Sequence, residues 1–289
     1  MATILAVGTA TIDRVFYVDG YPDENQELRA SHFCHRRGGN ATNSLVVLSQ
    51  LQHQCSWSGV WVEKPESQII IDELRHYNID LSHTKRLQSG VAPVSAVIVN
   101  NTNGSRTIVH YRDMPELMFE DFAAINLTPF DWVHFEGRNV DETEKMLRHV
   151  RAQVPACQIS LEIEKKRDSI DKIFPLADVL LFSKSYADAV GLSPEQLLHK
   201  VHKQVDQADC ICSLESKGAI GLTQQGNRVA SAAYIPEKVI DTLGAGDTFN
   251  AAIVDACLRQ LPLEAALNSA CRLAGKKCGQ QGLHRLVPG

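Results

Sequence analysis

Apolar and polar positions alternate in two different ways along the 289-residue chain. From about residue 130 to residue 216, short apolar runs are separated by stretches in which apolar residues recur every three to four positions. The apolar runs, which predict buried strands, are WVHFEG (132–137), QISLEIE (158–164), DVLLFS (178–183) and DCICSLES (209–216). The intervening stretches, which predict helices, are 141–153, 169–177 and 194–204. Strands that alternate with helices form a parallel sheet with right-handed crossovers, so we expect an α/β core.

Polar residues stand at the carboxyl ends of these predicted strands. They are Glu136, Gly137 and Arg138, then Glu162 and Glu164, Ser183 and Lys184, and Glu215 to Gly218. Ligands of open α/β sheets bind outside the carboxyl ends of the strands, so we expect the site at this edge. An alternative for Glu136 and Arg138 is a structural ion pair at a strand end. Asp141 and Glu144 have capping-box spacing, which predicts the start of a helix.

The first third of the chain has β-rich segments joined by turns. Residues 14–22, 27–37 and 93–113 are predicted to be extended, and Asn103-Gly104 between two β-rich runs indicates a hairpin. The N-terminal MATILAVGTA predicts a further, buried strand. We therefore expect a small antiparallel sheet, formed by segments of about 14–37 and 91–112, that covers the site as a lid.

No repeat or Gly/Ser linker marks a boundary between domains, so we expect residues 1–289 to form a single domain.

Composition narrows the kind of partner. The net charge is −5 and no long basic run is present, which argues against a nucleic-acid partner or an anionic membrane surface. The expected partner is a small molecule. No signal peptide is evident, and no apolar run approaches the roughly 20 residues of a membrane span. The eight cysteines form no CxxC pair, which is typical of reduced thiols in the cytoplasm.

The stretch DTLGAGDTFNAA (241–252) combines a loop of small residues with an acid at the start of a predicted helix. Gly244, Ala245 and Gly246 would let phosphate oxygens reach backbone N–H groups at the helix N-terminus. Asp247 has the chemistry to accept the proton of an attacking hydroxyl. The alternative is that Asp247 only caps the helix after a glycine turn.

The stretch RRGGNATNSLVVLSQLQ (36–52) places a glycine pair before an amphipathic helix. Gly38 and Gly39 allow a close approach of the backbone to a ligand. Asn40 and Asn43 lie about one helical turn apart, and their amides can bind the neighbouring hydroxyls of a sugar. The alternative is an asparagine-capped helix after a tight turn.

Together these segments resemble the paired signatures of the pfkB, or ribokinase-like, family of carbohydrate and nucleoside kinases. The resemblance covers nearly the whole chain and rests on Gly8, Asp13, GGNATN (38–43), NNTNGSRTIV (100–109) and DTLGAGDTFNA (241–251), in the family's order. It implies a three-layer core, with a mostly parallel sheet between helices and a small β-sheet lid. It also implies ATP as the phosphoryl donor and Mg²⁺ as the accompanying cation.

The resemblance implies roles for individual residues. Asp247 is the implied base, and Gly244, Ala245 and Gly246 are the implied anion hole. The residues implied for substrate binding are Asp13, Gly39, Asn40, Asn43, Arg106, Glu136, Arg138 and Asp247. The residues implied for nucleotide binding are Lys184, Glu215, Gly218, Gly244, Gly246 and Cys278.

Within the family, HFEGRN (134–139) and AGKKCGQQG (274–282) are most similar to kinases that act on ketohexoses. The implied reaction is the ATP-dependent conversion of D-fructose to D-fructose 1-phosphate. Two alternatives stay open, a ribokinase-like or nucleoside kinase and a non-catalytic sugar or nucleotide sensor. The intact GAGD argues against the sensor, because a sensor needs no positioned base.

The sequence departs from the family's pattern in two places. Where many members have an NxxE motif that organises magnesium, this chain has SKSYADA (183–189), so the arrangement of magnesium stays open. Where ketohexose kinases have an acidic lid residue at the sugar site, this chain has Asn25, which leaves the preference among sugars open. Whether K⁺ binds near Asp241, as a monovalent cation does in some members, also stays open.

The lid strands predict a homodimer. Val94, Ala96 and Ile98 alternate with Val97 and Val99, so both faces of residues 93–100 are apolar. One face can cover the site, and a second copy of the chain would bury the other. We expect Val97 and Val99 to lie at that interface, with cover by a local helix or loop as the alternative.

Overall fold

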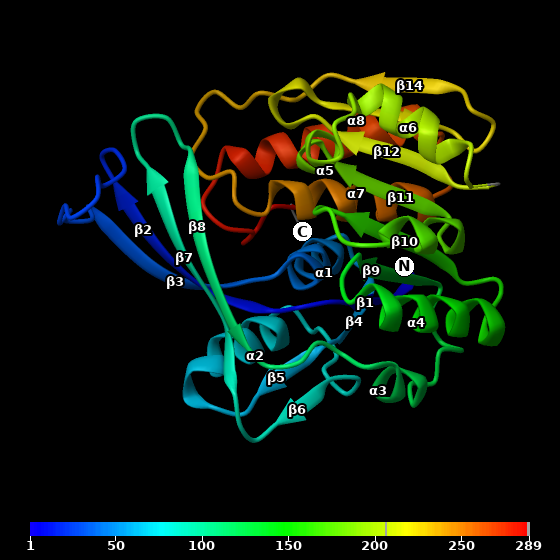
Figure 1. Cartoon of the computed structure of the whole chain (residues 1–289), viewed down its shortest axis with the longest axis horizontal. Coiled ribbons are helices and arrows are strands. Elements are labelled where there is room, and N and C mark those ends of the chain that lie inside the picture. Colours follow the sequence, from blue (N-terminus) through cyan, green and yellow to red (C-terminus); the bar gives the residue numbers. More distant parts are fainter. Residues whose placement is uncertain (206, 288–289) are drawn as a thin grey trace.

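The computed structural model describes residues 1–205 and 207–287 and contains two main sheets (Figure 1). The large sheet has eight strands in the order β14-β13-β12-β11-β10-β9-β1-β4. In this order their bounds are Arg228–Ser231, Ala219–Leu222, Asp209–Ser213, Val179–Ser183, Gln158–Ile163, Trp132–Glu136, Thr3–Val7 and Gln54–Ser58. The strands from β12 to β4 are parallel, and β13 and β14 are antiparallel additions at one edge. The predicted α/β core is therefore confirmed.

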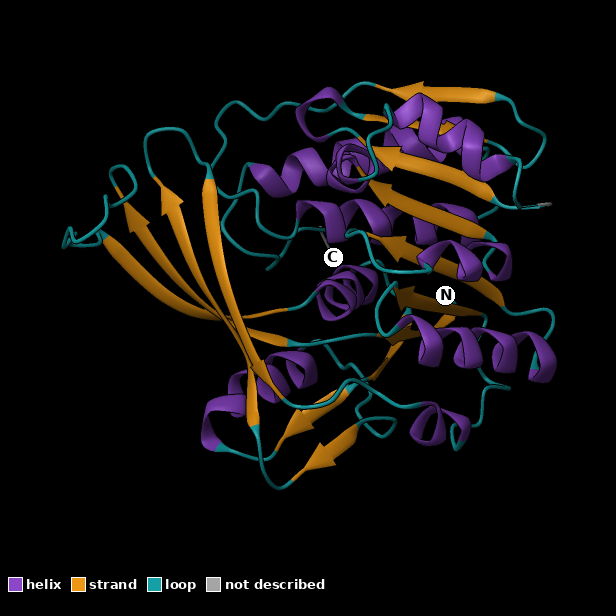
Figure 2. Ribbon diagram, in the orientation of Figure 1, coloured by secondary structure: helices purple, strands orange, loops and turns teal. Residues whose placement is uncertain are grey.

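Helices cover both faces of the large sheet (Figure 2). Successive residues of β1 point to opposite faces, so that Ile4 packs in one core cluster and Leu5 in the other. The helices on the Ile4 side are α1 (Asn40–Gln50), α2 (Gln68–His76), α7 (Ala245–Leu258) and α8 (Leu263–Cys278). Those on the Leu5 side are α3 (Phe119–Ala123), α4 (Val140–Gln153), α5 (Lys184–Ala189) and α6 (Pro194–His202). Burial on both faces explains why these strands are continuous apolar runs.

Two local details differ from the sequence prediction. The segment predicted as a helix at 169–177 is a 3₁₀ helix, Ile170–Leu176, in which Pro175 lacks the N–H that a longer α-helix would use. Asp141 and Glu144 do not form a capping box, because the N-cap of α4 is Asn139, two residues before Asp141. Their carboxylates instead form ion pairs with basic side chains, both with Lys172 and Glu144 also with Arg148.

The small sheet stands at one side of the large one and has the order β3-β2-β7-β8 (Figure 1). Its strands are β3 (His32–Gly38), β2 (Thr11–Val18), β7 (Val91–Asn100) and β8 (Arg106–Asp113). The outer pairs are antiparallel and the central pair, β2 and β7, is parallel. The predicted hairpin is present, with Gly104 at a φ of 70. Shorter elements are β5 (Val60–Val62), β6 (Lys85–Leu87) and 3₁₀ turns at Pro65–Ser67 and Glu215–Lys217.

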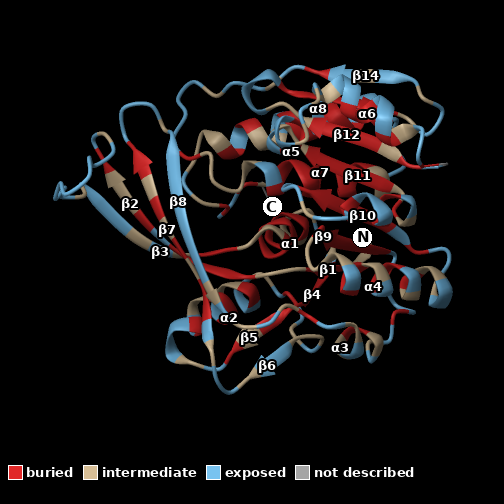
Figure 3. Ribbon diagram, in the orientation of Figure 1, coloured by how far each residue is buried: buried red, intermediate tan, exposed pale blue. Residues whose placement is uncertain are grey.

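The two faces of the small sheet differ from the sequence prediction. Val97 and Val99 are buried with Val15 and pack against Leu243, in the loop before α7, so they face the large sheet rather than a partner. Side chains alternate along a strand, and the opposite face therefore carries Ile98. On β8 and β3 the same outer face carries Val109, which is 66% exposed, and Phe33, which is 46% exposed. Figure 3 shows β8 exposed along most of its length.

Among the described residues, no helix is both long and apolar enough to cross a membrane.

Candidate active site

Two helices begin at glycines beside the carboxyl edge of the large sheet. Gly39 precedes α1 with a φ of 106, and Gly244 precedes α7 with a φ of 85, in the region that favours glycine. A Cβ on Gly39 would lie 2.2 Å from the carbonyl oxygen of Thr9, so no other residue fits there. A Cβ on Gly244 would lie 3.8 Å from Nδ2 of Asn43. The two glycine motifs therefore meet in one place, although Asn43 and Asp247 are separated by 204 residues in the sequence.

Asp247 is buried in the first turn of α7 but does not cap that helix. The N-cap is Gly244, and no side chain among the described residues caps the first N–H groups of the helix. The Asp247 carboxylate instead accepts a hydrogen bond from Nδ2 of Asn43 at 2.6 Å. The interpretation of Asp247 as a simple helix cap is therefore wrong.

The two asparagines of α1 reach acidic and basic partners. Asn40 follows the N-cap Gly39, and its Nδ2 donates to Glu162 at 3.1 Å and to Glu164 at 3.0 Å. The Asn43 oxygen accepts a hydrogen bond from Arg37 at 2.8 Å, which directs its Nδ2 at Asp247. The asparagine-cap interpretation is therefore also wrong. The sequence predicted the importance of both asparagines but not these partners.

Four carboxylates influence one another at this edge. Burial raises the pKa of Asp247, the charges of Glu164 and Glu136 raise it further, and the hydrogen bond from Asn43 opposes the shift. Burial also raises the pKa of Glu162 well above its usual value, with the charge of Asp247 as the next cause. Repulsion of this kind makes the cluster favourable for a cation.

Glu162 has an oxygen available for such a cation. Its Oε1 accepts from Asn40 and from Asn250, at 3.1 and 3.0 Å, whereas its buried Oε2 has no hydrogen-bond partner among the described residues. No cluster of three or more potential metal ligands occurs in 1–205 or 207–287. Mg²⁺ in nucleotide sites is commonly held by one or two carboxylates, water and phosphates, so Glu162 and neighbouring Glu164 fit such an ion. The sequence identified these residues only as polar strand ends.

Glu136 and Arg138 form the ion pair that was the alternative interpretation, with 3.5 Å between Nη1 and Oε2. Glu136 also accepts the backbone N–H of Ala41 at 2.8 Å and that of Thr9 at 3.3 Å. It thus fixes the start of α1. A small cavity beside the pair is also lined by Gly8, Thr9 and the side chains that follow β8.

The lid reaches the loop that precedes α7. Arg106 of β8 donates to the hydroxyl of Thr242 at 2.6 Å, and Arg36 of β3 pairs with Asp241 at 2.8 Å. Asp13 lies on the same face of the small sheet and is buried, with a hydrogen bond from Thr11 at 3.0 Å. The predicted lid residues therefore face the side on which α7 begins.

The residues predicted for the nucleotide lie at or beside the same edge. Lys184 is the first residue of α5 and pairs with Asp188. Glu215 and Gly218 form the turn between β12 and β13, and a Cβ on Gly218 would lie 2.0 Å from the carbonyl oxygen of Ser231. Cys278 ends α8, and its carbonyl accepts the N–H groups of residues 240 and 241. The fold therefore requires a glycine at position 218, in addition to the predicted role of Gly218 in nucleotide binding.

Asp241 does not fit as a ligand for K⁺. Its Oδ2 contacts Nη1 of Arg36, Nζ of Lys277 and the N–H of Gly282, and its Oδ1 accepts the N–H of Leu243. These donors hold the pKa of Asp241 far below its usual value, even though its burial acts in the opposite direction. Nothing in the sequence indicated that Lys277 would be buried here.

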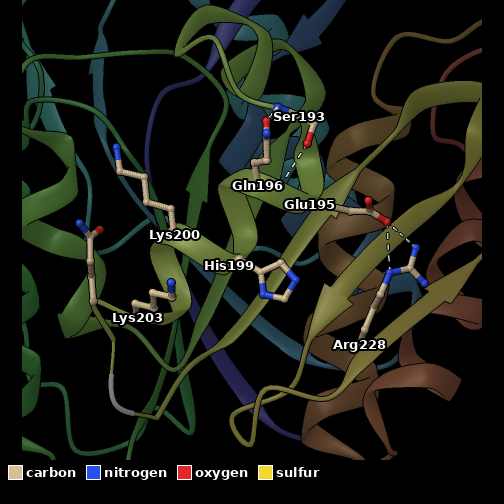
Figure 4. Close-up of a pocket in the computed structure, with 8 residues that line it drawn as sticks. Ser193, Glu195, Gln196, His199, Lys200, Lys203 and Arg228 are labelled. Atoms are coloured by element: carbon tan, nitrogen blue, oxygen red, sulfur yellow. Dashed lines mark hydrogen bonds and ion pairs between the residues drawn. The ribbon is translucent and has the colours of Figure 1, made fainter.

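A separate surface hollow beside α6 shares no residue with this site (Figure 4). It is lined by Ser193, Glu195, Gln196, His199, Lys200, Lys203, Gln204 and Arg228. Glu195 and Arg228 form an ion pair at 2.7 Å, and each is more than half exposed. This open hollow of exposed polar side chains includes the N-terminal end of α6 and lacks the buried carboxylates of the candidate site.

Comparison with known proteins gives consistent results. Residues 1–288 match the pattern of the pfkB family carbohydrate kinases. Mouse (Mus musculus) ketohexokinase is 37% identical over 293 residues, which cover 98% of each chain. A putative ribokinase from Agrobacterium tumefaciens has a similar structure, with a TM-score of 0.85, 21% identity and coverage of 97% and 92%. Arabidopsis thaliana ribokinase in complex with ribose and ATP gives a TM-score of 0.79, 19% identity and coverage of 97% and 94%.

Proposed function

The chain belongs to the pfkB family of carbohydrate kinases, and on that basis we propose that it phosphorylates a ketohexose with ATP. The proposed preferred reaction converts D-fructose to D-fructose 1-phosphate. The observation that carries this proposal is the contact between Asn43 and Asp247 at the glycine-led start of α7, which joins the proposed sugar-binding and phosphate-binding motifs. We further propose that residues 1–289 act as one kinase domain.

In the proposed mechanism, Asp247 accepts the proton of the carbon-1 hydroxyl as that oxygen attacks the γ-phosphorus of ATP. The hydrogen bond from Asn43 orients the carboxylate. The N–H groups of Gly244, Ala245 and Gly246 would bind the phosphate at the N-terminus of α7, where the helix dipole stabilises negative charge. In the structure, the Ala245 N–H donates to the Thr242 carbonyl oxygen at 3.3 Å. A bond forms between the oxygen on carbon 1 and the γ-phosphorus. The bond between the γ-phosphorus and the oxygen that leaves with ADP breaks, and Asp247 holds the proton.

The sugar lies between α1 and the lid in this proposal. Its hydroxyls interact with Asp13, Gly39, Asn40 and Asn43, while the neighbouring Glu136, Arg138 and Arg106 complete the site. A site that is built to bind a hydroxyl discriminates strongly against an analogue that lacks it. The support is positional: Asp13 and Arg106 share the inner face of the small sheet, and Glu136 bonds to the start of α1.

The nucleotide lies along the other half of the carboxyl edge in this proposal. Its proposed contacts are Lys184, Glu215, Gly218, Gly244, Gly246 and Cys278. Glu162 and Glu164 would hold Mg²⁺ with the phosphates, and the ion would neutralise part of the phosphate charge. The unpartnered Oε2 of Glu162 supports this assignment.

All eight cysteines are free thiols, which supports placing the enzyme in the cytoplasm.

The substrate assignment is tested by measuring ADP release with ATP, Mg²⁺ and a panel of sugars and nucleosides. We expect D-fructose to exceed ribose and adenosine in kcat/KM by at least about tenfold, because the site must bind the hydroxyls of a ketohexose. NMR of the product should place the phosphate on carbon 1. A nucleoside or ribose as the best substrate would overturn the ketohexose assignment, and no turnover with any acceptor would favour the sensor.

We also propose a homodimer in which two lids pair through their outer faces. The apolar residues exposed there include Val109 and Phe33, and a second copy would bury them. Val109→Asp should convert a wild-type dimer to a monomer at micromolar concentration, because a carboxylate would be buried in an apolar interface. Sedimentation velocity measures this directly.

Ile235→Asp is the matched control for the dimer. Ile235 is 75% exposed but lies in the loop between β14 and α7 rather than on the small sheet. We expect this variant to remain dimeric. A monomeric wild type, or a Val109→Asp protein that sediments as a dimer, would contradict pairing through this face.

A further inference from the structure

Lys277 is a fully buried cation in the last turn of α8. Its side chain has a relative exposure of 0%, whereas the adjacent Lys276 is exposed. Lysines in the last turn of a helix usually remain in solvent, where they interact with the helix dipole. Burial disfavours the charged form and lowers the pKa of Lys277, while the charge of Asp241 opposes that effect. An ammonium group in such a position requires a specific set of oxygen partners.

Three oxygens surround the Lys277 ammonium group. Nζ lies 2.7 Å from the backbone oxygen of Asp241, 3.1 Å from its Oδ2 and 3.4 Å from the backbone oxygen of Gln280. A lysine ammonium has three N–H donors, so each donor has a partner. Two of the three partners belong to Asp241, only three residues before Gly244.

The contacts of Asp241 extend this arrangement to the proposed phosphate site. Oδ1 of Asp241 accepts the N–H of Leu243 at 2.9 Å, which fixes the loop immediately before Gly244. The Lys277 side chain also lies directly beneath that loop, because a Cβ on Gly244 would be 3.8 Å from Cε of Lys277. Lys277 itself is too deeply buried to contact a substrate.

We propose that Lys277 is a positioning residue, an internal cation that holds the loop from Asp241 to Gly244 so that the N-terminus of α7 is aligned with the transferred phosphate. This inference rests on the proposed phosphate-binding role of that helix terminus. It also accounts for the poor fit of K⁺ at Asp241, since an ammonium group of the chain already contacts the carboxylate and the carbonyl oxygens there.

Turnover of a charge-removing variant is the first measurement. Lys277→Met keeps most of the side-chain volume but removes the charge and the donors. We expect kcat to fall by about 10²-fold, the loss that a displacement of about 1 Å at a reacting centre produces. The dissociation constant of the sugar should remain close to that of wild type, because Lys277 touches none of its proposed ligands. Lys276→Met makes the same change on the exposed neighbour and should retain the wild-type kcat.

Chemical rescue separates positioning by a cation from a purely structural role. Lys277→Ala leaves a space lined by the Asp241 and Gln280 oxygens, and K⁺ or methylammonium should enter it. We expect either cation to raise both kcat and the thermal midpoint of Lys277→Ala by more than it raises those of wild type. Lys277→Met should not respond, because its side chain fills the space.

Several results would overturn the proposal. They are a wild-type kcat in Lys277→Met, an equal loss in Lys276→Met, or a Lys277→Ala protein that no small cation affects in rate or midpoint. If Lys277→Met does not fold, Lys277→Gln, which keeps N–H donors without the charge, decides instead: a reduced kcat supports the proposal and a wild-type kcat overturns it. The kcat of each variant can be compared with that of wild type using whichever acceptor is the best substrate. A failure of the fructose assignment can therefore be distinguished from a failure of the Lys277 proposal.

Discussion

Asp247→Asn is expected to lower kcat by about 10²–10⁴-fold, the contribution typical of a general base, while the protein remains folded. The asparagine has nearly the same shape and can keep an oxygen toward Nδ2 of Asn43, which lies 2.6 Å from the carboxylate in the wild type. It cannot accept the proton of the attacking hydroxyl. Steady-state kinetics with saturating ATP and sugar measure the loss.

The matched control for this variant is Asp255→Asn in the same helix. Asp255 is also buried, but its carboxylate pairs with His53 at 3.0 Å and with Arg259 at 3.4 Å. Removing the charge of the Asp255 carboxylate should lower the stability of the protein and leave kcat near the wild-type value. Near-normal turnover of a pure Asp247→Asn preparation would remove Asp247 from the mechanism.

The dependence on pH gives the same prediction a second readout. Burial and neighbouring carboxylates raise the pKa of Asp247, so kcat/KM of the wild type should fall on the acid side at a pH above the usual aspartate range. The folded protein also binds this proton more tightly than the unfolded chain. This difference in proton affinity stabilises the folded protein. Its contribution to the free energy of unfolding is fully present below the unfolded-state pKa and is lost as the pH rises through the raised folded-state pKa. The thermal midpoint of Asp247→Asn should therefore decline less than that of wild type toward alkaline pH.

The sequence predicted the core of the fold well because the relevant signal is local. Each buried strand from β9 to β12 is a short apolar run, and α4 and α6 have a clear helical period. The faces of the lid could not be predicted in the same way. Both faces of β7 are apolar, and only the packing of Val97 against the distant Leu243 shows which face is internal.

The candidate site shows the same division between local and long-range information. The two glycine motifs identified Asn43 and Asp247, but their contact spans 204 residues and depends on the packing of α1 beside α7. Glu162 was visible only as a polar residue in a strand, since its unpartnered oxygen is a property of the surrounding side chains. Lys277 has the sequence context of a solvated helix end, and its partner Asp241 lies 36 residues away.

Gly246→Val is expected to lower kcat by at least about 10²-fold, a loss comparable to that of one oxyanion-hole donor. The expected loss does not come from the backbone angles of this residue. Gly246 lies in the first turn of α7 without a positive φ, and a Cβ there would have no atom within 4 Å. A valine therefore fits the fold, and its helix propensity is no worse than that of glycine.

The open space at Gly246 is where a phosphate must approach the N–H groups at the start of α7, so the branched side chain should exclude the ligand rather than unfold the protein. The thermal midpoint of Gly246→Val should match wild type, and Gly246→Ala should lose less activity because its side chain is smaller. Gly244→Ala provides the contrast: with a φ of 85 at that position, this variant should lose stability as well as activity. ATP turnover by Gly246→Val equal to that of wild type would show that the α7 N-terminus does not bind phosphate.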